Sequence, residues 1–346
     1  MLNVFDGIEL EAIAATVSKT RVPVEVRCQN LIEEKKAKRL MKSTGFRKLS
    51  IADEQYCTSD LCVTAAKALF RKDFRTKDIG AVIFITQTAD YFSPSSSYLI
   101  QDQLGLDHDV LVFDINHGCS GFVYGLYIAA SLLSNMERKV LICCGDTSSR
   151  TAYPLDTSML SIAGDAGAAA IVGKKQNAAE KKMYFHIESY GEKAKYIYMP
   201  RGAYRAPKLT ENGKLTMDAG NYGIMHGTEV TDFTLDYVPQ NIRKLLQYVS
   251  MDVEKINLML LHQANRLIVT SIGESLGLPA EKVPMAAEEI GNVSSASIPV
   301  CITEMERMGR WTSYPRLLLS GFGIGMSIAS AVLENQDIKA LETIEL

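Results

Sequence analysis

The sequence predicts an α/β protein made of two duplicated βαβ-type halves, with layered sheets and buried helices. Three observations support this fold class. The triplet Leu-Gly-Leu occurs at 104–106 and again at 276–278, and similar elements surround both copies. Short apolar strands alternate with helical stretches, which is typical of parallel sheets packed between helices. Strands such as 139–144 and 316–320 show no polar alternation, so both of their faces are expected to be buried.

The first copy begins with a predicted strand over 81–86, and a helical stretch follows it to the first triplet. A strand over 110–115 then leads through the turn 116–121 into a helix over about 121–133. This helix is apolar on all sides, so we expect it to be buried. The apolar strand 139–144 ends the copy.

The second copy begins with a strand over 258–261 and runs through a helical stretch to the second triplet. A strand-like segment, a turn at 291–295 and a helix of small and apolar residues are expected next, before the strand 316–320. The polar segment 173–182 lacks apolar side chains larger than alanine, which predicts a boundary between halves 1–175 and 176–346. Chemistry is then expected at equivalent turns of the two halves.

Composition excludes several classes of function. The net charge of −3 argues against nucleic acid as the main partner. No apolar run approaches the roughly 18 residues that a membrane helix needs. No basic segment precedes the first apolar stretch, so the N-terminus is unlike a secretory signal. The seven cysteines form no CxxC pair, and neither a metal site nor a disulfide framework is expected. Reduced thiols and a cytoplasmic location are the simple interpretation.

Cys119 is the candidate nucleophile because it lies where the strand 110–115 meets the helix 121–133. A thiol at a helix N-terminus feels the positive end of the helix dipole, so we expect its pKa to be lowered. Gly118 and Gly121 permit a sharp turn and the close approach of a substrate. A cysteine is more often a small buried hydrophobic residue, and that interpretation suits Cys143 and Cys144 in their core strand.

His262 and Asn292 are the candidate partners of Cys119. His262 ends the strand 258–261, and Asn292 occupies the turn of the second copy that corresponds to the turn of Cys119 in the first. Each alone has a structural explanation, as a core histidine and as a turn asparagine. Together, at duplicated positions, they predict a site where a thiolate attacks a thioester while imidazole and carboxamide donate hydrogen bonds to a developing oxyanion.

These segments resemble the β-ketoacyl-acyl carrier protein synthase III family of the thiolase superfamily. The similar stretches cover nearly the whole chain, and the most specific are LHQAN at 261–265 and GNVSSASIP at 291–299. The resemblance implies a thiolase fold and a homodimer. It implies a Cys-His-Asn triad, with Cys119 in the N-terminal half and His262 and Asn292 in the C-terminal half. It also implies no metal or cofactor, and further site residues: the main-chain N–H groups of Cys119 and Ile324 as an oxyanion hole, and Arg150, Asn265 and Arg266 as substrate contacts.

The implied reaction is a ping-pong Claisen condensation. An acyl group passes from acyl-CoA or an acyl carrier protein to Cys119, and malonyl-ACP then condenses with loss of carbon dioxide to give a 3-oxoacyl-ACP. Asn292 hydrogen-bonds but cannot abstract a proton, so the carbanion is expected to arise by decarboxylation. Two alternatives stay open. One is acyl transfer to an alcohol or amine in a specialised pathway. The other is a non-catalytic subunit of a condensing heterodimer, against which the intact triad argues.

Departures from the family pattern bear on the carrier of the primer. The family commonly has a tryptophan and an arginine shortly before its TGIR motif, and Arg39 and Ser43 stand at those positions here. Arg266 comes one place early in HQANRL, where the family has HQANLR, whereas Arg150 matches an arginine linked with CoA. We therefore expect an acyl carrier protein to be a partner that delivers the primer. We expect the charged run 33–38 to be a solvated helix face, and docking of an acidic carrier protein is the alternative.

Overall fold

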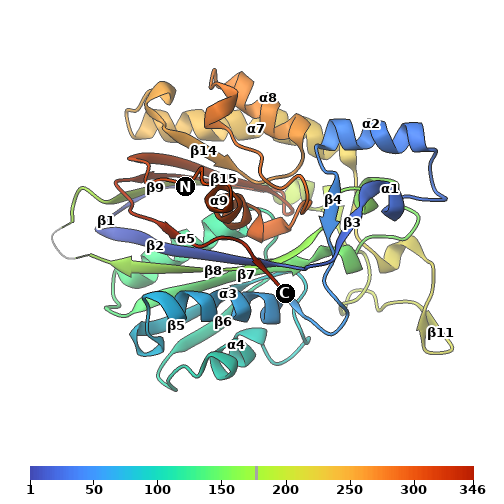
Figure 1. Cartoon of the computed structure of the whole chain (residues 1–346), viewed down its shortest axis with the longest axis horizontal. Helices are drawn as coiled ribbons and strands as arrows, with labels where there is room; N and C mark the ends of the chain where they lie inside the picture. The colour runs from blue at the N-terminus through green and yellow to red at the C-terminus, as the bar shows by residue number, and fades with distance from the viewer. Residues whose placement is uncertain (176–177) are drawn as a thin grey trace.

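The computed structural model describes residues 1–175 and 178–346, and helices separate and cover its two main sheets (Figure 1). One sheet has five strands in the order β1(Leu2–Asp6), β9(Lys182–Ser189), β16(Ser327–Glu334), β15(Arg316–Gly323) and β14(Leu258–Leu261). The other has seven, in the order β17(Lys339–Ala340), β2(Ile8–Val17), β8(Asp165–Lys174), β7(Lys139–Thr147), β5(Ile79–Ile85) and β6(Leu111–Ile115), with β18(Ile344–Glu345) also on β2.

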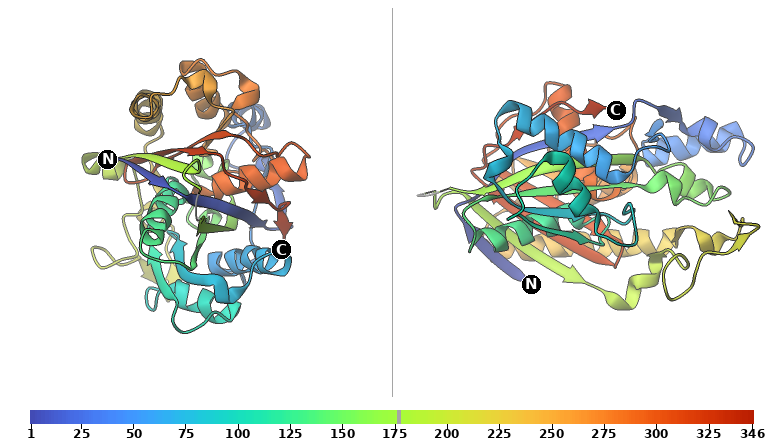
Figure 2. Two further views of the ribbon diagram at one scale, coloured as in Figure 1. Left: turned by 90° about the vertical axis from the view of Figure 1, so that its left-hand side faces the viewer. Right: turned by 90° about the horizontal axis from the view of Figure 1, so that it is seen from below.

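Helices form the other three layers, as the two further views make plain (Figure 2). Those on the outer face of the seven-stranded sheet are α3(Thr58–Lys72) and α4(Ser96–Leu104). Those between the sheets are α5(Gly121–Leu133) and α9(Ser297–Arg307). Those on the outer face of the five-stranded sheet are α7(Gly227–Tyr248) and α8(Arg266–Ser275). The predicted α/β class with layered sheets and buried helices is confirmed.

Smaller elements gather at one end of the molecule, at the right of Figure 1. They include the short helices α1(Val24–Arg27), α2(Glu34–Thr44) and α6(Thr157–Leu160). Three two-stranded ladders complete the described strands: β3(Arg21–Pro23) with β4(Lys48–Ser50), β10(Ile197–Tyr198) with β13(Ile224–Met225), and β11(Thr210–Glu211) with β12(Lys214–Leu215).

Burial explains why the central strands read as unbroken apolar runs. Every residue of β5 and β14 is buried, and β7 is buried beyond its first residue. Successive side chains of a strand point to opposite faces, so from Ala81 onward the odd and even positions of β5 enter two different cores. Ile83 lies in the core between the sheets, whereas Val82 lies in the core under α3. Gly167 of β8 lets α3 approach, since a Cβ there would lie 2.6 Å from the main-chain nitrogen of Cys62.

The strands predicted over 81–86, 110–115, 139–144, 258–261 and 316–320 are confirmed as β5, β6, β7, β14 and β15, and the helix over 121–133 as α5. The prediction of a strand after the second Leu-Gly-Leu is wrong. Residues 279–290 contain a 3-10 turn (Ala280–Lys282) and no strand. Pro279 and Pro284 explain the difference, because proline has no N–H to donate to a sheet ladder.

The predicted boundary between the halves lies at 175/176, and residues 176–177 are outside the described part of the chain. β8 and β9 flank this stretch and belong to different sheets. Each sheet also takes strands from the other end of the chain, since β1 pairs with β9 while β17 and β18 pair with β2. Within 1–175 and 178–346, no helix combines the length and apolarity needed to cross a membrane.

A pair of identical substitutions tests the core. Leu260→Ala, at a fully buried position of β14, is expected to lower the free energy of unfolding by about 2–5 kcal/mol. Leu267→Ala, on α8 where the side chain is 54% exposed, is expected to change it by no more than about 0.5 kcal/mol. Urea denaturation of both variants measures the difference, and equal losses would contradict the assigned core.

Candidate active site

Cys119 lies in the turn that joins β6 to α5, at the N-terminal end of a helix between the two sheets. The Gly121 N–H donates to the Gly118 carbonyl at 2.7 Å and closes this turn. A Cβ at Gly118 would lie 2.6 Å from the side-chain oxygen of Gln87, so a larger residue there would have to displace that side chain. The Cys119 residue is partly exposed, as a nucleophile that a substrate must reach has to be.

The end of β15 runs directly against this turn. A Cβ at Gly321 would lie 2.7 Å from Ser120 Cα, and a Cβ at Gly323 would lie 2.9 Å from Cys119 Cβ. Glycine is therefore required at both positions for the strand to pass so near. The main-chain groups of Ile324 and of Cys119 itself hydrogen bond the Cys119 sulfur and lower its pKa. These are the two groups that the family resemblance assigns to an oxyanion hole.

His262 follows the last residue of β14 and is 2% exposed. Its own N–H donates to the Ser320 carbonyl at 2.9 Å, which ties it to β15. The ring Nδ1 lies 2.6 Å from Ser297 Oγ, at the start of α9. Burial lowers the pKa of His262 to about 3, and a main-chain hydrogen bond with Ser294 offsets only part of this effect. The imidazole is therefore neutral at physiological pH and has one N–H to donate.

Asn292 is held in a turn that is tied to the loop before β8. Its N–H donates to the Ile162 carbonyl at 2.7 Å, and its carbonyl accepts from the Gly164 N–H at 3.0 Å. The preceding Gly291 has φ +93°, a backbone conformation that L side chains rarely adopt. The Asn292 Oδ1 accepts from the Ser294 N–H at 3.0 Å, so the Nδ2 amide is left to donate to a substrate.

Ser294 is the shared neighbour that brings the three predicted residues together. Its N–H binds the Asn292 side chain, its main chain contacts the His262 ring, and its hydroxyl lies beside the Cys119 sulfur. Ser294 has φ +51°, which is uncommon for a residue other than glycine. Strained conformations of this kind cluster at functional sites.

The expectation of a lowered thiol pKa is wrong. Burial, and secondly the charge of Asp146, raise the pKa of Cys119 to about 11. The Ser294 hydroxyl and the two main-chain N–H groups lower the pKa of Cys119, but their effect is smaller than that of burial. Burial therefore favours the neutral thiol over the thiolate at neutral pH.

Two polar residues at the site were missed by the sequence analysis. Asp146, at the end of the apolar strand β7, is 2% exposed and raises the pKa of Cys119. Ser297 orients the His262 ring. A carboxylate two residues after the apolar run Val140–Cys144, within the same strand, was the available signal for Asp146, because charged residues are seldom buried without a purpose.

The three predicted substrate-binding residues lie outside this cluster and have protein partners. Arg150 donates to the carbonyls of Asp53 and Tyr56 at 2.8 and 2.7 Å. The Asn265 side chain caps α8 by accepting from the Ile268 N–H at 2.8 Å. Arg266 forms an ion pair with Glu288 at 2.5 Å. A role in substrate binding stays a prediction for all three.

The layered sheets and the cysteine turn between them define a thiolase-fold protein. A solved structure of a 3-oxoacyl-(acyl-carrier protein) synthase from Burkholderia xenovorans superposes with a TM-score of 0.91. The two sequences are 29% identical, and the matched region is 100% of this chain and 99% of the Burkholderia chain. The sequence matches two family descriptions, 3-Oxoacyl-[acyl-carrier-protein (ACP)] synthase III over residues 113–191 and its C-terminal part over residues 246–335.

Curated relatives agree with these matches. A β-ketoacyl-[acyl-carrier-protein] synthase III of Syntrophomonas wolfei is 31% identical over 304 residues, which are 86% of this chain and 90% of the relative. A putative 3-oxoacyl-[acyl-carrier-protein] synthase 3 of Campylobacter jejuni is 29% identical over 344 residues and 96% of each chain. The chain therefore belongs to the β-ketoacyl-[acyl-carrier-protein] synthase III family.

The raised pKa gives a direct test on the free thiol. Because the thiolate is the nucleophile, alkylation of Cys119 by iodoacetamide is expected to rise about tenfold per pH unit from pH 7 to 9. No plateau is expected in this range, since the pKa of Cys119 lies near 11. Peptide mapping after timed alkylation measures the rate at this residue, and a plateau below pH 8 would contradict the assignment.

Proposed function

We propose that the protein is a decarboxylating condensing enzyme that transfers an acyl group to Cys119 and joins it to malonyl-ACP. The observation that carries this proposal is the neutral, buried His262 beside Asn292, with the Asn292 Oδ1 already occupied by the Ser294 N–H. Both side chains are then hydrogen-bond donors rather than bases. Such a pair suits an enolate that forms by loss of carbon dioxide, for which no proton has to be abstracted.

In the first half-reaction, the Cys119 sulfur attacks the carbonyl carbon of an acyl thioester. The negative charge that develops on the carbonyl oxygen is stabilised by the main-chain N–H groups of Cys119 and Ile324, which point toward the sulfur. The tetrahedral intermediate then collapses, the bond to the donor sulfur breaks, and the donor thiol leaves with a proton. The product is an acyl-enzyme at Cys119.

In the second half-reaction, the malonyl thioester loses carbon dioxide and its electron pair becomes an enolate. His262 and the Nδ2 amide of Asn292 donate hydrogen bonds to the enolate oxygen. Its carbon attacks the acyl group on Cys119, and the cysteine thiolate leaves to give a 3-oxoacyl-ACP. Burial strengthens these hydrogen bonds, because His262 lies in a site from which water is largely excluded.

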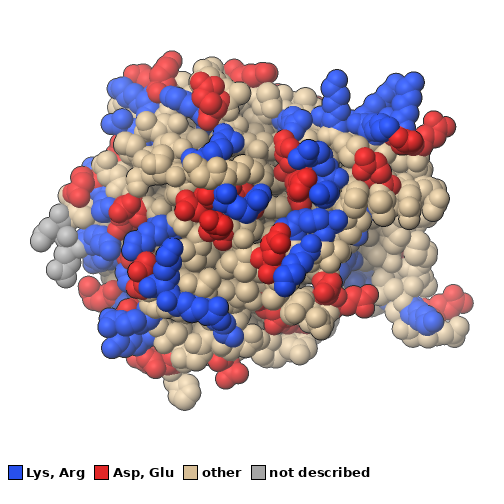
Figure 3. Space-filling view, viewed as in Figure 1, with Lys and Arg blue, Asp and Glu red and all other residues tan. Residues whose placement is uncertain are grey.

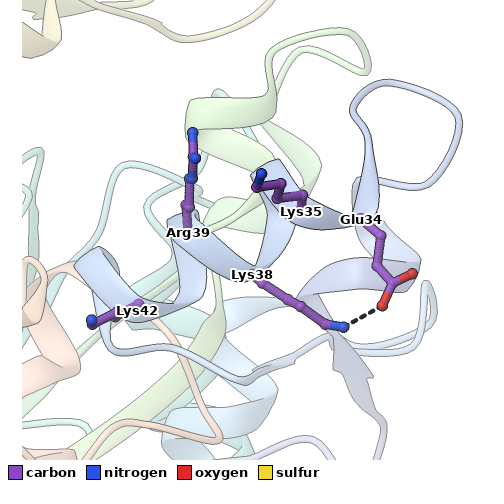
Figure 4. Close-up of a pocket in the computed structure, with 5 residues that line it drawn as sticks. All are labelled: Glu34, Lys35, Lys38, Arg39 and Lys42. Atoms are coloured by element: carbon purple, nitrogen blue, oxygen red, sulfur yellow. Dashed lines mark hydrogen bonds and ion pairs between the residues drawn. The ribbon is translucent and has the colours of Figure 1, made fainter.

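The carrier protein is proposed to dock on α2, where basic side chains gather at the upper right of Figure 3. Figure 4 shows Lys35 and Arg39 extending from one side of this helix, with Lys42 a turn further on. Lys38 instead pairs with Glu34. Lysine and arginine side chains on an exposed helix suit an acidic partner, because complementary charge speeds association. No aromatic side chain stands at the Arg39 position to stack on the adenine of CoA.

A second copy of the chain is proposed to pair along β6. This strand ends its sheet and is largely apolar, and Leu111 is 48% exposed. Sheet edges of this kind are usually covered. Phe92 and Tyr204 are 74% and 92% exposed and contact one another edge to face, which adds apolar surface outside the two main sheets. The cytoplasm is the proposed location, since the seven cysteines are all free.

Mutation of His262 and Asn292 tests whether these residues act mainly in the second half-reaction. His262→Ala and Asn292→Ala are each expected to slow release of carbon dioxide from malonyl-ACP by about 10²–10³-fold, because each removes one oxyanion donor. Acylation of Cys119 is expected to fall much less. His186→Ala, at a buried histidine bonded to the Asn241 carbonyl, is the control and should leave the ratio of the two rates unchanged. Equal losses in both half-reactions would contradict the assignment.

The carrier of the primer is open to a competition test. The same acyl group is expected to acylate Cys119 from a carrier protein at lower concentration than from CoA, since a lost adenine stack weakens CoA by about ten- to hundredfold. Charge reversal at Lys35 and Arg39 should slow transfer from the carrier protein and not from CoA. Lys67→Glu, at an exposed position of α3, is the matched control. Efficient acylation from micromolar acyl-CoA with no gain from the carrier protein would refute the docking assignment.

A further inference from the structure

A network of polar side chains joins the turn that carries Cys119 to the loop that carries Ile324. The His117 Nε2 lies 2.7 Å from Ser120 Oγ, which in turn lies 2.8 Å from Ser327 Oγ. The Ser327 hydroxyl donates to the Ile324 carbonyl at 3.0 Å. Ser120 and Ser327 are 1% and 2% exposed and lie 207 positions apart in the sequence. Two buried hydroxyls from the two halves are therefore in direct contact, and the mechanism above uses neither.

The direction of these hydrogen bonds follows from what each group can donate. The Ile324 carbonyl only accepts, so it takes the single proton of the Ser327 hydroxyl. The Ser327 oxygen then accepts from the Ser120 hydroxyl, and the Ser120 oxygen accepts from the His117 Nε2–H. The His117 ring therefore carries its hydrogen on Nε2. This ring packs against Tyr124, with the two ring centroids 4.3 Å apart, so its orientation is fixed as well.

The loop that the network holds is short and has a glycine at its centre. Residues 324–326 connect β15 to β16. Gly325 has φ +136°, a conformation that L side chains rarely adopt. The Ser327 hydroxyl holds the first carbonyl of the 324–326 loop, and the Tyr190 N–H holds the last at 2.8 Å. Such anchors restrict the loop, because glycine by itself allows many backbone conformations.

The position of this loop matters because the loop lies against the nucleophile. A Cβ at the preceding Gly323 would lie 3.0 Å from the Cys119 sulfur, and a Cβ at Gly118 would lie 3.3 Å from Ile324 Cδ1. In the proposed acyl transfer, the Ile324 N–H stabilises the oxyanion, which requires a donor within about 2.7–3.1 Å of that oxygen. A displacement of about 1 Å can therefore slow the reaction by about 10²-fold.

We propose that His117, Ser120 and Ser327 are positioning residues, which hold the 324–326 loop in place for acyl transfer. Ser327 acts on the loop carbonyl directly, Ser120 fixes the orientation of the Ser327 hydroxyl, and His117 fixes that of Ser120. The three side chains act through the main chain of the loop and form no bond with the acyl group. This inference rests on the acyl-transfer step of the proposed function.

Ser327→Ala tests this role by comparing two reactions of the same thiol. Attack of Cys119 on an acyl thioester develops an oxyanion, whereas its alkylation by iodoacetamide does not. Acylation at saturating thioester should slow by about 10- to 100-fold, with little change in the thioester concentration that gives half the maximal rate. The ratio of the acylation rate to the alkylation rate should fall by at least about tenfold. Equal losses in the two reactions would show damage to the thiol itself and would overturn the proposal.

Ser330→Ala is the matched control. Ser330 lies on the same strand as Ser327, is fully buried and lies 2.9 Å from another hydroxyl, that of Ser320. The control should leave both rates near those of the wild type, and a similar fall in their ratio would overturn the proposal. Ser327→Thr keeps the hydroxyl and should recover most of the lost acylation. A rate no higher than that of Ser327→Ala would contradict the role of this hydroxyl.

A double variant tests whether the two serines act as one network. If Ser120 acts through Ser327, then Ser120→Ala/Ser327→Ala should be acylated about as fast as Ser327→Ala alone. Losses that multiply would show two independent contributions and would overturn the proposal. His117→Gln keeps an N–H donor and should be acylated faster than His117→Leu, which has none. Equal rates in these two variants would contradict the assignment of His117.

The outcomes separate this inference from the proposed function. If wild-type protein accepts no acyl group, the proposed function itself fails. An active wild type with normal acylation in Ser327→Ala refutes the present inference alone. If Ser327→Ala does not fold, the two His117 variants decide, because His117 is half-buried and its replacement leaves both buried hydroxyls in place.

Discussion

The site depends on one close approach, that of β15 to the turn carrying Cys119. Gly321 and Gly323 allow the strand to pass within van der Waals distance of Ser120 and Cys119, and a Cβ at Gly323 would lie 3.0 Å from the sulfur. This approach places the Ile324 N–H beside the thiol. Through the pairing of β14 with β15 it also places His262 on the same side. The two halves of the chain therefore build one reaction centre.

The same close packing sets the chemistry. Burial disfavours the charged forms of both the thiol and the imidazole. It raises the pKa of Cys119 to about 11 and lowers the pKa of His262 to about 3. An ion pair between the two is then disfavoured. A neutral imidazole can donate to an enolate oxygen, and a neutral thiol needs a route for its proton.

Much of the fold was predictable, because fully buried strands leave unbroken apolar runs such as those of β5, β7 and β14. The triad candidates followed from the duplicated turns around Cys119 and Asn292. The thiol pKa was not predictable, because a helix dipole can be inferred from local sequence whereas burial and the charge of Asp146 depend on tertiary packing. The strand expected in the second copy does not form for a local reason, namely the prolines at 279 and 284. The similarity between the two copies favoured a strand there in spite of these prolines.

The most direct test of decarboxylating condensation is the mass of the product. Protein incubated with an acyl thioester should first gain the mass of one acyl group on Cys119, seen by intact-protein mass spectrometry. Added malonyl-ACP should then restore the original protein mass and yield a carrier protein bearing the acyl group extended by two carbons, with one carbon dioxide released. Acyl transfer to an alcohol or amine, with the malonyl group unchanged, would contradict the account.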